Sequence, residues 1–556
     1  MARAGRWLIS GILLAIVSAA AATAADAPLT VRAVPWGPSV AEADAARGAV
    51  LSSAAVKRLL GKADAAVVSF TLLESPSVPG KPAIPPSRYL AQVFDYSNNR
   101  AYEVQGTIRG AAARLDIRET AVQPEPDDAE RDRAIAIIRQ DAKLGPAVRD
   151  GLLVPYRPMP PLVDGDLPVG AKNRTVAIGL KPTSAAVQHE IVGVDMIDRA
   201  VVRYPERAPQ TARAALLACG PNDAGQPTTS RGTAGQVQIT IQKGTDTIWS
   251  FLAIRPAASS GTRASGLELR DVFYHGKKVL ARAHVPILNV HYDGDACGPY
   301  RDWQYQEGQF AAHGRDILGS CTTSGCSGVR AARSKPETMV EDGTDNGNFR
   351  GFAYFVDGQS VTLESEMEAG WYRYISIWTF DADGSIHPRF GFDGVNNSCI
   401  CAVHHHNAYW RFDFDIATAA NNQIYQVNSG TPTLQTAEAR QLRTAGRTWQ
   451  IKNSATGEGY AIIPGAHDGT ADSYGRGDVW LLLAKSSGGT PTELDDGVNI
   501  TTGANTFIMM DNFVGPEALT ATSDVVFWYG GHFDHDVNND DEDAHIVGPD
   551  LVPINW

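Results

Sequence analysis

The sequence predicts a mainly β protein, in which a large carboxy-terminal β-sandwich follows two small α+β domains. Glycine (53 of 556 residues) and proline (32) are frequent, charged residues make up only 20%, and long helical periodicities are scarce, which favours many turns. From residue 236 onward, short alternating apolar segments such as 247–254 and 371–380 are typical of strands. The length exceeds what one hydrophobic core normally serves, so we expect several domains.

The first 25 residues have the features of a secretory signal peptide. Arg3 and Arg6 precede an apolar segment at 7–17, and small residues at 22–25 offer cleavage sites. An uncleaved anchor is less favoured, because the segment gives way to alanines and no later stretch approaches a membrane-spanning length. We therefore expect a secreted or periplasmic protein with no membrane association in the mature form. Six cysteines suit disulfides in that compartment, in a pairing that the sequence does not decide.

Two similar α+β domains are expected at 30–120 and 121–204. An alanine-rich helical pattern lies at 39–62, and a second amphipathic one at 127–150. Strands are predicted after the first helix at 67–73, 89–94 and 101–108, and after the second near 175–180 and 190–204. The shared order indicates a weak internal repeat. A segment rich in Ala, Pro, Gly and Thr at 205–235 is a linker candidate before the sandwich, 236–556.

One strand of the sandwich, at 403–416, carries two pairs of candidate metal ligands. Its large apolar residues recur at every second position, at Trp410, Phe412, Phe414 and Ile416. His404 and His406 share one face, because side chains two apart on a strand point the same way. Asp413 and Asp415 have the opposite parity. Imidazoles suit copper or zinc and carboxylates suit a hard cation. The alternative is a surface histidine run, or a run that binds metal only adventitiously.

Two further stretches of the sandwich contain possible functional groups. Tyr372, Tyr374 and Trp378 lie on one face of the strand predicted at 371–380, where aromatic residues usually pack in a core. The apolar stretch that starts at Asp524 runs into a glycine pair and two histidines, 532 and 535. Neither stretch identifies a function by itself.

The order of these segments resembles that of the copper-containing (topaquinone) primary amine oxidases. The matching segments are 248–251, 266–274, 285–286 with Tyr292, 370–374, 404–406 with 411–415, 447–449, 477–480 and 524–528. The resemblance covers nearly the whole mature chain. It implies an amine-oxidase-type sandwich, a homodimer, and a small primary amine and oxygen as reactants.

The resemblance implies two metal sites. Copper(II) is expected at His404, His406 and a third histidine counted on from Asp524; that position is His535, with His532 as second choice. Three imidazoles suit Cu(II) and leave positions for water or oxygen. A second, oxygen-only set suits calcium: Asp413, Asp415 and Asp524, with the backbone carbonyls of Phe414 and Val525.

The resemblance also assigns the cofactor and exposes departures from the family pattern. Tyr372 matches the tyrosine that becomes topaquinone, and Tyr292 matches the tyrosine that hydrogen-bonds the quinone oxygen. Tyr372 is flanked by Trp371 and Arg373, where the family has Asn and Asp or Glu.

The position of the family's catalytic base falls on Gln306, which cannot accept a proton as a carboxylate does. Two nearby carboxylates offer a substitute. We expect Glu307 to serve because it is adjacent to the aligned position, with Asp302 as the other candidate.

The resemblance thus implies secreted, copper- and quinone-dependent oxidative deamination of a primary amine to an aldehyde, with release of ammonia and hydrogen peroxide. The alternative is a catalytically impaired, copper-binding relative with a binding or structural role. A carbohydrate- or surface-binding sandwich with incidental histidines does not explain the order of the segments. The formal net charge of −13 without clustered basic residues argues against nucleic acid as a partner.

Overall fold

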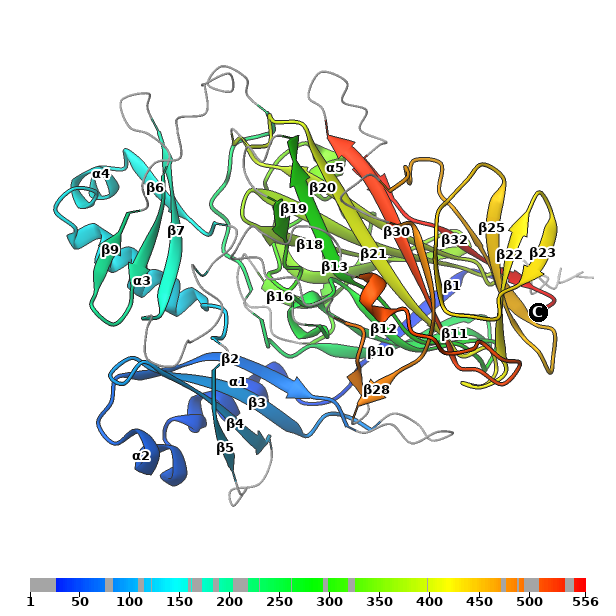
Figure 1. Cartoon of the computed structure of the whole chain (residues 1–556), viewed down its shortest axis with the longest axis horizontal. Helices are drawn as coiled ribbons and strands as arrows, with labels where there is room; N and C mark the ends of the chain where they lie inside the picture. Colours follow the sequence, from blue (N-terminus) through cyan, green and yellow to red (C-terminus); the bar gives the residue numbers. More distant parts are fainter. Residues whose placement is uncertain are drawn as a thin grey trace, which may run out of the picture.

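The computed structural model describes residues 27–556 except 76–83, 109–114, 122, 159–161, 163–172, 184–189, 204–218, 230, 262, 294–298, 319–325, 398, 472–476, 488–489, 495–509 and 536–544. The expected fold class is confirmed, since 50% of the described residues are in strands and 11% in helices. Two small α+β bodies lie on one side of a large β-sandwich (Figure 1). The predicted signal peptide, 1–25, lies outside the described residues. Among those residues, no helix combines the length and the apolar character needed to cross a bilayer.

The first α+β module contains two helices where the sequence pattern indicated one. Helix α1 (Val40–Val50) begins with a capping box formed by Ser39 and Glu42. Helix α2 (Ala54–Leu60) begins at a second cap, where the Ser53 side chain accepts a hydrogen bond from the backbone N–H of Val56. The helices accompany an antiparallel sheet of β2 (Ala65–Leu73), β3 (Arg88–Asp95), β4 (Arg100–Thr107) and β5 (Asp116–Thr120).

The second module has the same order of elements. Helices α3 (Asp128–Gln140) and α4 (Gly145–Arg149) precede a sheet of β6 (Leu153–Tyr156), β7 (Thr175–Pro182), β8 (Glu190–Asp195) and β9 (Ala200–Val202). The repeat extends to one turn. Asp95 ends β3 and accepts two backbone N–H bonds through Oδ1, and Asp195 does the same at the end of β8. In each turn the fourth residue on, Asn99 or Arg199, has φ 54°.

The amino-terminal strand belongs to the sandwich and not to the first module. Strand β1 (Leu29–Pro35) pairs antiparallel with β10 (Gln236–Lys243) along its whole length. The expected domain 30–120 therefore begins too early, because this pairing joins segments some two hundred positions apart that no local pattern relates. The described part of the expected linker is also fixed to the sandwich, through a disulfide between Cys219 and Cys401.

Two large sheets form the sandwich. The first has the order β1, β10, β11 (Asp246–Ile254), β12 (Glu268–Tyr274), β13 (Lys277–Tyr292), β21 (His404–Phe414), β30 (Val525–His535), β27 (Val479–Leu483) and β24 (Ala439–Gln441), with β14 (Pro299–Arg301) beside β13. The second has the order β15 (Gly314–Asp316), β16 (Cys326–Ala332), β17 (Phe349–Asp357), β18 (Ser360–Ala369), β19 (Tyr372–Asp381), β20 (Ile386–Gly394), β32 (Asp550–Ile554), β26 (Gly459–Ile463), β25 (Arg447–Asn453), β22 (Asn422–Asn428) and β23 (Thr431–Leu434), with β31 (Ile546–Val547) beside β20.

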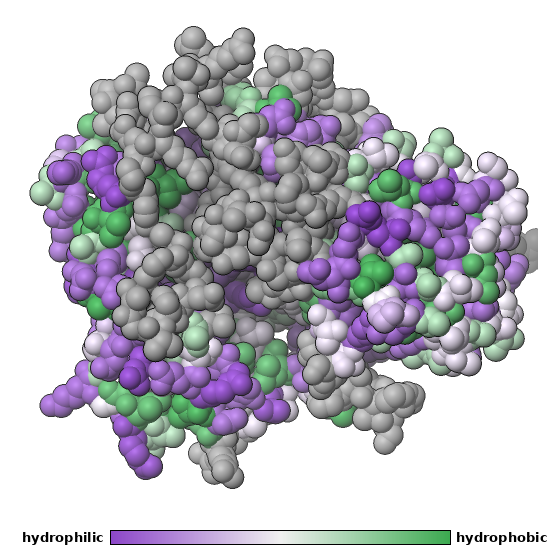
Figure 2. Space-filling model, in the orientation of Figure 1, coloured by the Kyte–Doolittle hydropathy of each residue, from purple (hydrophilic) through white to green (hydrophobic). Residues whose placement is uncertain are grey.

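Smaller elements complete the sandwich: helix α5 (Met339–Asp342), the 3₁₀ turns Pro256–Ala258 and Met510–Phe513, and the ribbon of β28 (Ser486–Ser487) and β29 (Thr490–Pro491). On the face shown in Figure 2, hydrophilic and hydrophobic residues are interspersed over the end of the sandwich at the right. The largest apolar side chains, including seven fully buried tryptophans, lie in the interior.

The core between the sheets is built by aromatic residues from facing strands. Trp378 of β19 meets Phe412 of β21 edge-on at 6.4 Å between ring centroids, and Phe390 of β20 meets Trp410 at 6.3 Å. These residues belong to one continuous buried cluster. The period-two apolar residues of β21 therefore face the second sheet, as the alternation predicts.

Strands β21 and β30 run side by side through the first sheet (Figure 1) in an unbroken register. The pairing extends from His404 opposite His535 to Phe414 opposite Val525. Residues directly opposite in an antiparallel pair point to the same face. This pair of strands thus sets the position of both candidate metal sites.

Candidate active site

The three histidines expected to bind copper lie together between the two sheets. His404 and His406 alternate along β21, and His535 of β30 is the direct partner of His404. The ring centroids of His404 and His406 are 5.0 Å apart, and those of His404 and His535 are 4.7 Å apart. All three side chains are buried.

The second choice for the third histidine, His532, points to the opposite face. It lies across from Asn407, and its Nδ1 is 2.6 Å from the Asn407 side-chain oxygen. Its Nε2 is 3.1 Å from a carboxylate oxygen of Asp478. Of the two candidates, only His535 is directed toward His404 and His406.

His404 and His406 have the chemical state that metal ligation requires. Nδ1 of His404 lies 2.6 Å from the backbone oxygen of Ala402, an acceptor only, so Nδ1 carries the proton and Nε2 carries the lone pair. Within the described residues, the buried Nε2 atoms of His404 and His406 have no hydrogen-bond partner. Burial, followed by the charge of His535, lowers the pKa of His404 to about 3, and burial lowers the pKa of His406 well below its usual value. Neutral imidazoles with unused lone pairs fit a copper ion.

Tyr372 faces these histidines from the other sheet. It is the first residue of β19 and is completely buried. Its ring centroid lies 4.8 Å from that of His406 and 5.6 Å from that of His404. Phe392 of β20 stacks on His406, with 3.8 Å between ring centroids, and so covers one side of the His406 ring. The expected cofactor tyrosine and the expected copper ligands are therefore neighbours across the core.

Tyr292 holds the phenol oxygen of Tyr372. The two hydroxyl oxygens are 2.5 Å apart, and the indole Nε1 of Trp371 donates to the Tyr292 oxygen at 3.1 Å. Tyr292 also lies opposite His404 in the pairing of β13 with β21. Trp371, which departs from the family pattern, thus supports the tyrosine pair through a hydrogen bond.

Arg373, the second residue that departs from the family pattern, lies on the face of β19 opposite to Tyr372. Its guanidinium forms a buried ion pair with Asp345, at 2.7 and 3.0 Å. It also donates to the backbone oxygens of Gly370 and Tyr372, at 3.3 and 3.2 Å. Because neighbouring side chains on a strand point to opposite faces, this positive charge fixes the backbone at Tyr372 without facing its ring.

Glu307, the carboxylate expected to act as base, forms a buried ion pair with Arg255. Arg255 donates to both of its oxygens, with Nε at 2.7 Å from Oε1, and both side chains are fully buried. The backbone N–H of Ala257 adds a bond to Oε1 at 3.2 Å. Removing Glu307 from this pair would leave a buried charge alone, so the geometry does not favour our expectation for Glu307.

Asp302 is the carboxylate that the structure connects to the tyrosines. Its Oδ2 accepts a hydrogen bond from the hydroxyl of Tyr374, whose ring centroid is 5.6 Å from that of Tyr372. The Tyr374 oxygen is also 3.5 Å from Nδ1 of His406. Burial raises the pKa of Asp302 to about 7. Adjacency in sequence pointed to Glu307, whereas the irregular backbone after β14 turns Asp302 toward the site.

Gln306, at the position aligned with the family's base, contacts a residue that the sequence did not single out. The side-chain oxygen of Gln306 accepts a hydrogen bond from Arg157, which follows β6 in the second α+β module. No motif marks Arg157, and only the packing of that module against the sandwich brings it here.

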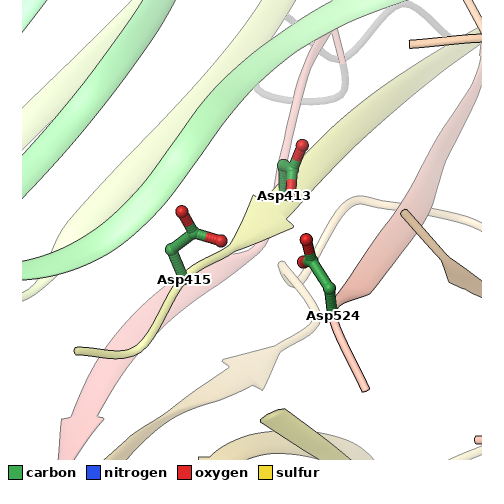
Figure 3. A group of neighbouring side chains, drawn as sticks. All are labelled: Asp413, Asp415 and Asp524. Carbon is green, nitrogen blue, oxygen red and sulfur yellow. The ribbon is translucent and has the colours of Figure 1, made fainter. Parts of the chain in front are cut away.

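The three aspartates expected to bind a hard cation also gather (Figure 3). Asp413 lies near the end of β21, Asp415 directly follows this strand, and Asp524 precedes β30. One carboxylate oxygen of each lies within 4.8 Å of the others. Burial first, then the neighbouring carboxylates, raises the pKa of Asp524 to about 8. Two cations already offset part of the charge: Lys278 lies 2.9 Å from Asp415, and Arg411 lies 3.0 Å from Asp413.

The fold that holds these residues is that of the copper-containing amine oxidases. The solved amine oxidase of Aspergillus nidulans is similar with a TM-score of 0.55 and 16% identity, over 94% of this chain and 88% of that one. A copper-containing benzylamine oxidase from Hansenula polymorpha is similar with a TM-score of 0.53 and 14% identity, over 85% of this chain and 89% of that one. No family model matches the sequence, and no curated protein matches it. At these identities, the likeness establishes the fold.

Proposed function

We propose that the protein is a copper- and quinone-dependent oxidoreductase that deaminates a primary amine to an aldehyde, with oxygen as the electron acceptor and with ammonia and hydrogen peroxide as the other products. The observation that carries the proposal is the buried Tyr372, 4.8 Å from His406 between ring centroids and hydrogen-bonded to Tyr292. The fold of known amine oxidases supports it.

Each residue has a defined task in this proposal. His404, His406 and His535 would hold copper(II), which with oxygen supplies the oxidation of Tyr372 to topaquinone and thereby an electron sink for the amine. Tyr292 orients the oxygen at the former phenol position of Tyr372. Asp302 takes the proton from the α-carbon of the substrate, and its raised pKa suits a base that works near neutral pH. The two packed sheets exclude bulk water from these groups.

The remaining expectations follow as parts of the same proposal. The protein is exported after removal of residues 1–25 and acts as a homodimer. Calcium binds at Asp413, Asp415 and Asp524, supported by the proximity of their oxygens and by the preference of Ca²⁺ for carboxylates.

One observation favours the alternative of a copper-binding relative without amine turnover. The family's base position is occupied by Gln306, which is engaged by the guanidinium of Arg157. An arginine at this place disfavours a simple alkylammonium, because like charges repel. In this alternative, the three histidines bind copper, but Tyr372 is not converted to a quinone and no amine is oxidised.

Reconstitution separates the two functions. The metal-free protein is loaded with copper in air, its copper content is measured, and it is treated with phenylhydrazine, which forms a coloured adduct with quinones. We expect one adduct per chain, on the peptide that contains Tyr372. The control Tyr372→Phe should bind copper equally and form no adduct. Full copper occupancy without an adduct in the wild type would leave only the copper-binding alternative.

A further inference from the structure

Arg157 is a buried cation with no anionic partner among the described residues. Its side chain is 5% exposed. Its two terminal nitrogens donate to the side-chain oxygen of Gln306 and to the backbone oxygen of Pro126. Within the described part of the chain, no carboxylate forms an ion pair with it and its Nε has no hydrogen-bond partner. A buried charge in such a state is costly unless an anion compensates it.

The neighbours of Arg157 add further unused donors. The guanidinium carbon lies 5.7 Å from the ring centroid of Trp303, and both Trp303 and Gln306 are completely buried. The indole Nε1 of Trp303 and the amide Nε2 of Gln306 have no hydrogen-bond partner among the described residues. Three residues in contact thus present three unused N–H groups and one positive charge, which is the donor set of a carboxylate site.

The same segment also carries unused acceptors. Gln304 and Asp302 are completely buried, and within the described residues both polar side-chain atoms of Gln304 and Oδ1 of Asp302 have no hydrogen-bond partner. The other carboxylate oxygen of Asp302 accepts a hydrogen bond from the hydroxyl of Tyr374. Acceptors with a carboxylate attract an ammonium group, while the donors at Arg157 attract an anion.

The donor cluster borders the proposed site. Tyr156, which precedes Arg157, packs on Trp371 with ring centroids 6.1 Å apart, and Trp371 packs on Tyr372 at the same separation. Trp303 follows Asp302 directly in the chain. Gln306 is four residues after Asp302, and four residues of extended chain span at most about 13 Å. This length is an upper limit for the distance between the backbone positions of Asp302 and Gln306.

We infer that Arg157, Trp303 and Gln306 bind the carboxylate of a zwitterionic substrate, whose ammonium end lies toward Asp302. The substrate class is an ω-amino carboxylate with several methylene groups between its charged ends. This inference rests on the proposed function and specifies its substrate. A diamine or an alkylamine would place a cation or an apolar group against the unpaired guanidinium and is discriminated against.

Calorimetry on the metal-free protein tests the binding step without catalysis. The probes are 5-aminopentanoate, glutarate, n-pentylamine and 1,5-diaminopentane. We expect 5-aminopentanoate to bind tightest and glutarate to bind measurably. Arg157→Gln should weaken both by about tenfold or more, the scale of a lost hydrogen bond to a charged group. The absence of heat with 5-aminopentanoate and glutarate at millimolar concentrations overturns the inference.

Two variants guard against a merely structural role for Arg157. Arg263 lies near the same junction of module and sandwich but is ion-paired with Glu125, so Arg263→Gln should leave the binding of glutarate within about twofold. Gln306→Glu places an anion beside Arg157 and should remove the binding of glutarate while the guanidinium stays. If Arg263→Gln weakens the binding as much as Arg157→Gln does, the assignment to Arg157 is wrong.

A pair of hydrazines links the binding site to Tyr372. In the copper-loaded protein, 4-hydrazinylbenzoate should form its adduct faster than phenylhydrazine, and Arg157→Gln should abolish this preference. If neither reagent forms an adduct but 5-aminopentanoate still binds through Arg157, the oxidase proposal fails and the carboxylate site stands. Adducts that form at equal rates in wild type and Arg157→Gln keep the oxidase and overturn the carboxylate site.

Discussion

The two ends of the β21–β30 pair place different ligands on opposite faces of one sheet. At one end, His404 and His535 point into the space between the sheets, where aromatic rings surround them and burial suppresses the charged form of His404. At the other end, Asp413 and Asp524 lie beside Arg411 and Lys278, which offset their charges. The same register thus yields a cluster of imidazoles at one end and a cluster of carboxylates at the other. The difference shows that the face of the sheet and the neighbouring side chains decide the charge state of each cluster.

The largest effect should come from removing one histidine. His406→Ala should weaken copper binding by more than about 100-fold and abolish the hydrazine adduct, because His406 is fully buried and closest to Tyr372. Copper content after dialysis provides the measurement. The matched control is His405→Ala, one residue away on the opposite face, where the ring contacts Asp534 and Asp293. Equal copper loss in both variants would contradict the division of the strand into two faces.

The next largest effect concerns the carboxylate beside the histidine end. Asp302→Asn should lower kcat/KM by about 10²–10⁴-fold with unchanged copper content. The pKa of Asp302 is raised to about 7 by burial, so the carboxyl is protonated below that pH and cannot accept a proton. Wild-type activity should therefore fall as the pH drops through about 7. Glu307→Gln should instead lower the melting temperature, because Arg255 would lose the partner of its buried ion pair. A loss of activity in Glu307→Gln at unchanged melting temperature would mean that Glu307 is the base.

At the aspartate end, we expect Asp524→Asn to raise or lower the free energy of unfolding depending on whether calcium is present. The pKa of Asp524 is raised to about 8. Between about pH 4 and pH 8, Asp524 is therefore protonated in the folded state and ionised in the unfolded state. The folded state binds more protons, so the free energy of unfolding falls as the pH rises through this range. Without divalent ions at pH 9, Asp524→Asn should raise the free energy of unfolding by about 1–2 kcal/mol.

In millimolar calcium, the same substitution should be destabilising, because a ligand that binds only the folded state stabilises it. Denaturant unfolding with and without calcium measures both signs. A stabilising effect of Asp524→Asn under both conditions would mean that Lys278 and Arg411 alone neutralise this end.

The smallest effect is expected for the hydrogen bond behind the tyrosine pair. Trp371→Phe removes the indole N–H that lies 3.1 Å from the Tyr292 oxygen and should lower the free energy of unfolding by about 1 kcal/mol. Copper content should not change, since no histidine loses a contact. Thermal unfolding measures the loss, and a large drop in copper content would show that the tyrosine pair also orders the histidines.

Local periodicity was sufficient to predict the faces of β21. The alternation around Trp410 and Phe412 assigned His404 and His406 to one side and Asp413 to the other, because side-chain direction on a strand follows from backbone geometry alone. The same reasoning predicted the mainly β fold and the α+β repeat. These features depend on residues close in sequence.

Pairings between distant segments required the tertiary structure. His404 lies opposite His535 because of the register of β30, and β1 joins the first sheet through its pairing with β10. Arg255, which directly follows β11, reaches Glu307, and Arg157 reaches Gln306 from another module. The sequence by itself determined which side chains share a face; the packing of distant segments decided which charges meet, because the partner of a buried charge is set by proximity in space and not by spacing along the chain.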